Sequence, residues 1–225
     1  MSKPNSDVQQ PVNRIQQNVL AASERRLINW ICPRLPAWVT PDLLTLIGVI
    51  GAVIIFAGYA LSGFSRDWLW LCIVGYSVQW FGDSLDGSIA RFRKIERPKF
   101  GYFIDHSCDG LTLLLILGGI GLSPWVRSDV ALFTLAGYLL LSIHAFLSTH
   151  VTGEFKLSYL AAGPTELRFV LIAMTLLMMA LPHNAGMTSG LSGFDMFVGI
   201  VGVVFVVLFV IQTLVTAKKL AAIKE

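Results

Sequence analysis

The chain has 225 residues, of which 55% are hydrophobic and 14% are charged, and its mean hydropathy is +0.68. This composition is too apolar for an ordinary soluble domain, and it contains several apolar runs long enough to cross a bilayer. The net charge of +3 is small, and no nucleic-acid partner is expected. The cysteines Cys32, Cys72 and Cys108 show neither paired nor Cys/His spacing, which predicts neither disulfides nor zinc.

The segment before the apolar runs divides into two parts. Residues 1–11 are polar and are expected to be disordered. Residues 12–41 are expected to form an interfacial arm, because residues 12–32 alternate apolar and arginine side chains in the manner of an amphipathic helix lying on a membrane. A soluble amphipathic arm is the alternative interpretation. Pro33 and Pro36 end this helix, and Thr40 and Pro41 suit the start of the next one.

Six apolar segments follow within residues 42–225. We place them at residues 42–63, 68–92, 100–122, 130–151, 165–182 and 194–216. Each can cross a hydrocarbon layer of about 30 Å, since a helix rises about 1.5 Å per residue. The predicted fold is therefore an all-α integral membrane domain of six transmembrane helices, preceded by the interfacial helix. Small residues such as Gly48, Gly51 and Gly202 favour close helix packing, within one subunit or in a homodimer.

The distribution of basic residues predicts the orientation. Lys and Arg concentrate in the arm, in residues 91–99, in residues 156–168 and at the C-terminal end, whereas the opposite side has Arg66 and Arg127. The positive-inside rule then places both ends of the sequence and residues 91–99 in the cytoplasm. We expect a multi-pass protein of the inner, cytoplasmic membrane. Most of the basic residues at 91–99, Arg93 and Arg97 included, are interpreted as surface charges attracted to anionic lipid.

Four aspartates lie where the second apolar segment ends and the third begins. Asp83 and Asp86 share one helix face by their i,i+3 spacing, and Asp105 and Asp109 share another by their i,i+4 spacing. Four carboxylates facing one another without a cation would repel strongly. The pattern therefore predicts a site for two hard divalent cations, Mg²⁺ or Mn²⁺, of the kind that serves phosphoryl chemistry. The site should lie near a membrane face, because polar residues enter each segment at one end.

The whole stretch has eight motif positions at fixed spacing: Asp83, Asp86, Gly87, Ala90, Arg91, Gly101, Asp105 and Asp109. This pattern resembles the signature of the CDP-alcohol phosphotransferases, also called CDP-alcohol phosphatidyltransferases, which are membrane enzymes of phospholipid biosynthesis. The resemblance implies a metal-dependent transferase that moves a substituted phosphate from a CDP-linked donor to a hydroxyl acceptor and releases CMP.

The resemblance also implies roles for single residues. The implied metal ligands are Asp83, Asp86, Asp105 and Asp109. Asp109 is in addition the implied general base, with a role as ligand alone as the alternative. The implied substrate contacts are Thr45, Gly87, Ala90, Arg91 and Gly101. Thr45 belongs to a segment that resembles the Pro-Asn-x-x-Thr element of the family, but Asp42 stands where Asn is usual. An ionised Asp donates no hydrogen bond, which puts that contact in doubt.

His106 and Glu166 are two further catalytic candidates. The Asp105-His106-x-Cys108-Asp109 pattern resembles the choline and ethanolamine phosphotransferase branch, where a nearby Thr-Glu pair matches Thr165 and Glu166. His106 could be the base in place of Asp109, since an imidazole titrates near neutrality, or it could be a packing histidine. Glu166 could orient His106 or the acceptor, or it could simply favour the start of its helix.

Three classes of function remain to be compared. The enzyme hypothesis leaves two donors open: CDP-diacylglycerol with a small polar alcohol, or a CDP-amino-alcohol with a lipid alcohol. The second class is a carboxylate-lined cation or proton transporter, for which acids near the midplane and inverted repeats would be expected. The third is a silent lipid-binding scaffold, for which loss of motif aspartates would be expected. The chain keeps all four motif aspartates, and they cluster at one end of their apolar segments, which favours the enzyme hypothesis.

Overall fold

The computed structural model describes residues 21–152, 164–186 and 190–222. These residues are all-helical and include no β-strand. Their elements in chain order are α1 (Ala21–Ile31), η1 (Cys32–Arg34), α2 (Pro41–Leu61), η2 (Arg66–Trp68), α3 (Leu69–Arg93), α4 (Pro98–Leu122), α5 (Ser128–Thr152), α6 (Pro164–Ala180) and α7 (Gly193–Ala221). The predicted disordered stretch 1–11 and the first part of the predicted arm lie outside the described residues.

The bounds of helices α2 to α7 agree to within a few residues with those of the six apolar segments. The prediction that these segments are helical is therefore confirmed. Four of them, α2, α4, α5 and α7, are long and apolar enough to cross a membrane. The α6 helix has 17 residues and is shorter than these, and α3 carries the charges of Asp83, Asp86, Arg91 and Arg93 in its second half. The predicted start of α2 is confirmed, because the Thr40 hydroxyl accepts a hydrogen bond from the Leu43 amide at 3.2 Å.

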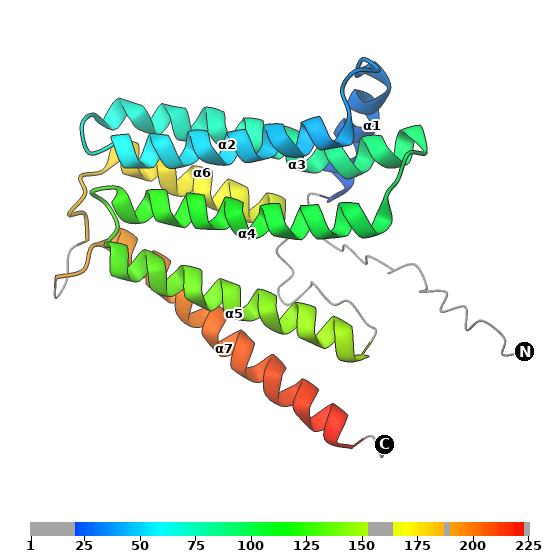
Figure 1. Cartoon of the computed structure of the whole chain (residues 1–225). Coiled ribbons are helices and arrows are strands. Elements are labelled where there is room, and N and C mark those ends of the chain that lie inside the picture. The colour runs from blue at the N-terminus through cyan, green and yellow to red at the C-terminus, as the bar shows by residue number, and fades with distance from the viewer. Residues whose placement is uncertain (1–20, 153–163, 187–189, 223–225) are drawn as a thin grey trace, which may run out of the picture.

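The helices pack as a connected series (Figure 1). The α6 helix lies on α3, α3 on α2, α2 on α4, α4 on α5, and α5 on α7. A buried polar chain joins the first part of this series, because the Tyr59 hydroxyl lies 3.1 Å from that of Tyr76 and 2.6 Å from that of Thr175. Thr175 donates in turn to the Leu171 carbonyl at 2.7 Å. These contacts satisfy the hydroxyl groups of α2, α3 and α6 inside the apolar core.

The α2–α3 contact is a crossing of backbones. A methyl group built on Gly82 would lie 2.2 Å from the Gly48 nitrogen, and one on Gly51 would lie 2.4 Å from the Gln79 nitrogen. Only glycine fits at such positions, because any Cβ would overlap backbone atoms that cannot move aside. The small residues predicted to pack are thus used within one subunit here, and the crossing sets Asp83 directly beside α2.

We expect Gly82→Ala to lower the free energy of unfolding in detergent by about 2 kcal/mol or more, because the added methyl group forces the two helices apart. Thermal unfolding followed by tryptophan fluorescence would measure the loss. Gly110→Ala is the matched control, since Gly110 is also helical but has no atom within 4 Å of a built Cβ. An unchanged melting temperature for Gly82→Ala would contradict this account of the crossing.

Two arginines near the α3–α4 turn, which were interpreted as surface charges, make specific contacts within the protein. The Arg93 guanidinium donates hydrogen bonds to the backbone oxygens of Leu35, Pro36 and Val39 at 3.0, 2.8 and 2.6 Å. These carbonyls belong to the turn between η1 and α2, where no helix supplies partners for them. Arg97 pairs with Asp42, the residue that stands in place of the usual Asn. Both arginines therefore join the start of α2 to the end of α3 rather than serving only as membrane-surface charges.

Helix α4 is packed unevenly along its length. Its buried residues are Ile116, Leu117, Gly119 and Ile120, all in its second half. A Cβ on Gly119 would lie 3.0 Å from the Phe56 Cα, whereas a Cβ on Gly101 would meet no atom within 4 Å. Among the described residues, the half of α4 that carries Asp105 and Asp109 is thus packed less closely than its second half.

Candidate active site

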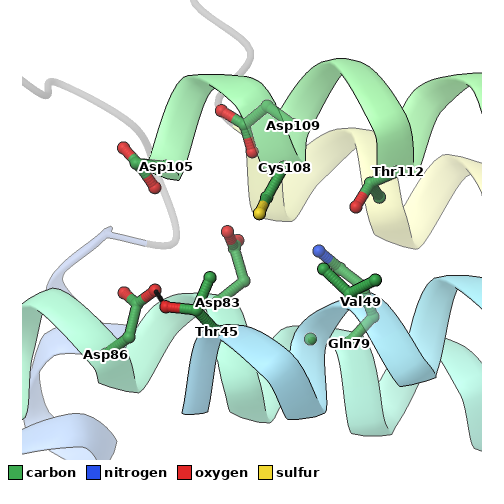
Figure 2. Close-up of a pocket in the computed structure, with 10 residues that line it drawn as sticks. Thr45, Val49, Gln79, Asp83, Asp86, Asp105, Cys108, Asp109 and Thr112 are labelled. Atoms are coloured by element: carbon green, nitrogen blue, oxygen red, sulfur yellow. Dashed lines mark hydrogen bonds between the residues drawn. The ribbon is translucent and has the colours of Figure 1, made fainter. Parts of the chain in front are cut away.

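The four predicted aspartates gather at one small pocket between α2, α3 and α4 (Figure 2). Its lining comprises Thr45, Gly48, Val49, Gln79, Asp83, Asp86, Asp105, Cys108, Asp109 and Thr112. In Figure 2 the Asp83 carboxylate points from α3 toward α4, where Asp105 and Asp109 lie above it. The arrangement follows from the helix spacing: each aspartate pair occupies one face of its own helix, and the two faces meet.

Asp86 is held by α2. The Thr45 hydroxyl donates a hydrogen bond to Asp86 Oδ2 at 2.7 Å, and the Gly87 amide donates to Asp86 Oδ1. Thr45 was expected beside the donor nucleotide, and the structure gives its hydroxyl a partner among the predicted metal ligands instead. A fixed carboxylate loses less freedom when it binds a cation, so Thr45 is suited to orienting Asp86.

Asp83 is held by α6. Its carboxylate forms an ion pair with Arg168, whose Nε also donates to Gln79 Oε1 at 2.6 Å. Sequence reasoning missed Gln79, although its i,i+4 spacing from Asp83 was a usable signal. The Arg168 contact has no such signal, because the two partners are 85 positions apart in the chain.

His106 lies beside both aspartates of α4. Its Nδ1 is 3.4 Å from Asp105 Oδ2 and 3.9 Å from Asp109 Oδ2. Its ring is stacked on Phe146 of α5 at 5.4 Å and contacts Tyr102 at 4.2 Å between centroids. The side chain of His106 is 9% exposed, whereas that of Asp109 is 48% exposed. The carboxylate is thus the more accessible of the two predicted bases, and the imidazole is the more enclosed.

The remaining predicted residues surround the pocket without lining it. A Cβ on Gly87 would lie 3.3 Å from Arg91 Nη1, so Arg91 folds back over the glycine, where it donates to Ser88 Oγ at 3.2 Å. Ala90 is half-buried one turn further along α3, and Gly101 is exposed on α4. Glu166 is half-buried in the first turn of α6, two residues before Arg168.

The donor set fits a hard divalent cation. Carboxylate oxygens from two helices converge, and Asp105, His106 and Asp109 alone offer three ligand atoms within 4.8 Å of one another. Oxygen ligands with a nearby imidazole are compatible with Mg²⁺ or Mn²⁺ and unlike the sulfur-rich sets of zinc or iron–sulfur centres. Repulsion among four carboxylates would also be relieved by a bound cation.

Residues 38–208 match the family described as CDP-alcohol phosphatidyltransferase. The chain belongs to this family. Its members are transferases of phosphate-containing groups, and metal dependence is general among them. The resemblance drawn from residues 83–109 is therefore confirmed, and the transporter hypothesis finds no support.

The chain is similar to proteins that are named for different activities. The chain is 40% identical over 89 residues to phosphatidylinositol phosphate synthase of Cutibacterium acnes, covering 39% of this chain and 40% of that protein. It is 32% identical over 142 residues to archaetidylinositol phosphate synthase of Pyrococcus horikoshii, covering 63% and 64%. It is 25% identical over 191 residues to cholinephosphotransferase 1 of Danio rerio, covering 78% and 49%. Each match spans less than two thirds of the relative's own length.

Proposed function

We propose that the chain is a divalent-metal-dependent CDP-alcohol phosphotransferase of phospholipid biosynthesis. It would transfer a substituted phosphate from a CDP-linked donor to a hydroxyl acceptor and release CMP. The observation that carries the proposal is the convergence of Asp83, Asp86, Asp105 and Asp109 from two helices on one pocket. The family assignment supports the reaction class.

The four aspartates would hold the metal, with Asp86 oriented by Thr45. Bound Mg²⁺ or Mn²⁺ supplies charge that neutralises the donor pyrophosphate and stabilises CMP as it leaves. Arg91, close to Gly87 at the edge of the motif, is suited to a second phosphate contact, because a guanidinium can donate two parallel hydrogen bonds to phosphate oxygens. Gly87, Ala90 and Gly101 carry little or no side chain, which leaves room for a substrate against the helices.

The acceptor hydroxyl must lose a proton as it attacks. Asp109 lines the pocket and is accessible, which supports it as the base, and His106 lies 3.9 Å from its carboxylate. The imidazole could therefore take the proton itself or accept it through Asp109. Glu166 stays a proposed orienting residue for His106 or for the acceptor.

Two pairs of donor and acceptor are the alternatives for the substrates. Homologues of the chain use CDP-diacylglycerol or CDP-choline donors. The Asp105-His106-x-Cys108-Asp109 pattern favours the CDP-amino-alcohol with a lipid alcohol as acceptor. The stronger local identity to a phosphatidylinositol phosphate synthase favours CDP-diacylglycerol with a small polar alcohol.

An assay of the purified protein with cytidine-labelled donors decides between these alternatives. CDP-diacylglycerol, CDP-choline and CDP-ethanolamine would each be offered with polar alcohols and with diacylglycerol or ceramide, and CMP release would be measured. We expect CMP release with one donor class, lost on chelation and restored by Mg²⁺ or Mn²⁺. Failure to release CMP from every donor and acceptor pair would contradict the proposal.

We further propose that α2 to α7 all cross the membrane, with α1 at the interface and the site on the cytoplasmic side of an inner membrane. The exposed apolar side chains of α7, such as Ile200 and Leu214, are suited to lipid contact. Single cysteines at positions 95 and 127 in a cysteine-free background test the orientation. A membrane-impermeant thiol reagent should label position 127 from outside and leave position 95 unlabelled. Labelling of position 95 from outside to the same extent as position 127 would overturn this orientation.

A further inference from the structure

Arg168 reaches from α6 across to two acceptors on α3. Its Nη2 pairs with Asp83 Oδ2, and its Nε donates to Gln79 Oε1 at 2.6 Å. Gln79 and Asp83 are four residues apart, so they present two oxygens on one helix face to the planar guanidinium. The Arg168 side chain is 12% exposed, which distinguishes this contact from a surface ion pair that water would screen.

A second contact holds the start of α6 in the same place. The Glu24 carboxylate of α1 accepts hydrogen bonds from Trp80 Nε1 at 2.8 Å and from the Ser84 hydroxyl at 3.0 Å. It also accepts one from the Thr165 hydroxyl at 2.9 Å. Thr165 lies one turn before Arg168, and Trp80 and Ser84 flank Asp83 on α3. The position of α6 therefore places Arg168 next to Asp83, and the contact does not depend on the flexibility of the arginine side chain alone.

This contact conflicts with the role of Asp83 as a metal ligand. The Oδ2 atom that faces Arg168 cannot accept a guanidinium and coordinate a divalent cation in the same direction, and the two positive charges repel. The inference rests on the proposed metal site. We propose that Arg168 competes with the divalent cation for the Asp83 carboxylate, so that Arg168 must leave Oδ2 when the metal binds.

If Arg168 instead helped the metal to bind, its removal would change the metal affinity in the opposite direction. An arginine that merely orients a ligand carboxylate through a second contact strengthens metal binding, and its removal weakens it. A competing arginine weakens metal binding, and its removal strengthens it. The affinity of the site for a metal ion therefore separates the two roles without reference to turnover.

Mn²⁺ binding by the purified full chain in detergent tests the proposal, with free Mn²⁺ followed by electron paramagnetic resonance. We expect Arg168→Gln to lower the apparent dissociation constant roughly tenfold, the usual size of one charged hydrogen-bonded contact. Arg91→Gln is the matched control, because it removes a nearby positive charge that donates a hydrogen bond to the Ser88 hydroxyl instead of pairing with Asp83. It should change the constant by about twofold or less, since an exposed charge is screened.

A milder variant guards against misfolding of Arg168→Gln. Gln79→Ala keeps the arginine but removes one of its two acceptors, and should tighten Mn²⁺ binding by a smaller factor of roughly threefold. Unchanged or weaker Mn²⁺ binding in both Arg168→Gln and Gln79→Ala would overturn the competition. Asp105→Asn should weaken Mn²⁺ binding in either background. Absence of Mn²⁺ binding by the wild type and all variants would instead refute the proposed metal site, and the competition with it.

Discussion

Asp83→Asn, Asp86→Asn and Asp105→Asn should each lower CMP release by about 10³-fold or more. Each substitution removes negative charge from a site that must hold positive charge next to the donor pyrophosphate, and such metal contacts are worth several kcal/mol in the transition state. Single-turnover rates with saturating Mg²⁺ would measure the loss. Substantial turnover in any of the three variants, with or without added Mg²⁺, would refute a site built on these carboxylates.

The structure separates the three variants by stability. Asp83→Asn leaves Arg168 enclosed without its carboxylate partner, so this variant should also melt at a lower temperature. Asp86→Asn and Asp105→Asn keep that ion pair and should stay close to the wild type. Asp129→Asn is a matched control, because this aspartate is exposed at the far end of the helices and pairs with Arg127. Its turnover should be unchanged.

His106→Ala should lower the chemical rate by roughly 10²–10⁴-fold if the imidazole takes the acceptor proton. Donor affinity should change little, because the aspartates and their metal, and not His106, would hold the pyrophosphate. Comparison of single-turnover rate with donor affinity measures both. His150→Ala, an exposed histidine of α5, controls for the loss of an imidazole.

The alternative outcome transfers the role to Asp109. A near-wild-type rate for His106→Ala would exclude His106 as the base, and its stacking on Phe146 would then account for it as a packing residue. Asp109→Asn alone cannot decide, because it removes a predicted ligand and a predicted base together. Glu166→Gln should give a smaller loss than His106→Ala if Glu166 orients the imidazole.

Hydropathy and short-range spacing predicted much of this protein. The six apolar segments correspond to α2–α7 because a membrane-spanning helix needs a long apolar run, and the Thr40 cap marks where the first begins. The four aspartates lie together because i,i+3 and i,i+4 spacings fix their helix faces. Four of these helices are long and apolar enough to cross a membrane, and α6 has the shortest run.

Contacts between distant segments could not be predicted in the same way. The Arg168–Asp83 pair, the Arg93 contacts with residues 35–39 and the Glu24 contacts with α3 and α6 all depend on which helices are neighbours. Charge counting interpreted Arg93 as a membrane-surface residue, because nothing local marks the carbonyls that it binds. Gln79 was predictable only in part. Its i,i+4 spacing from Asp83 is visible in the sequence, but a lone glutamine in an apolar run can serve many roles.

The uneven packing of α4 has a consequence for how the pocket can change shape. One wall, formed by α2 and α3, is fixed where the backbones of Gly48 and Gly82 touch. The other wall is the first half of α4, which carries Asp105 and Asp109; the buried residues of this helix begin at Ile116, and His106 joins the first half to Phe146 of α5. Widening of the pocket should therefore be a swing of α4 about a pivot near Gly119, with Asp83 and Asp86 remaining stationary.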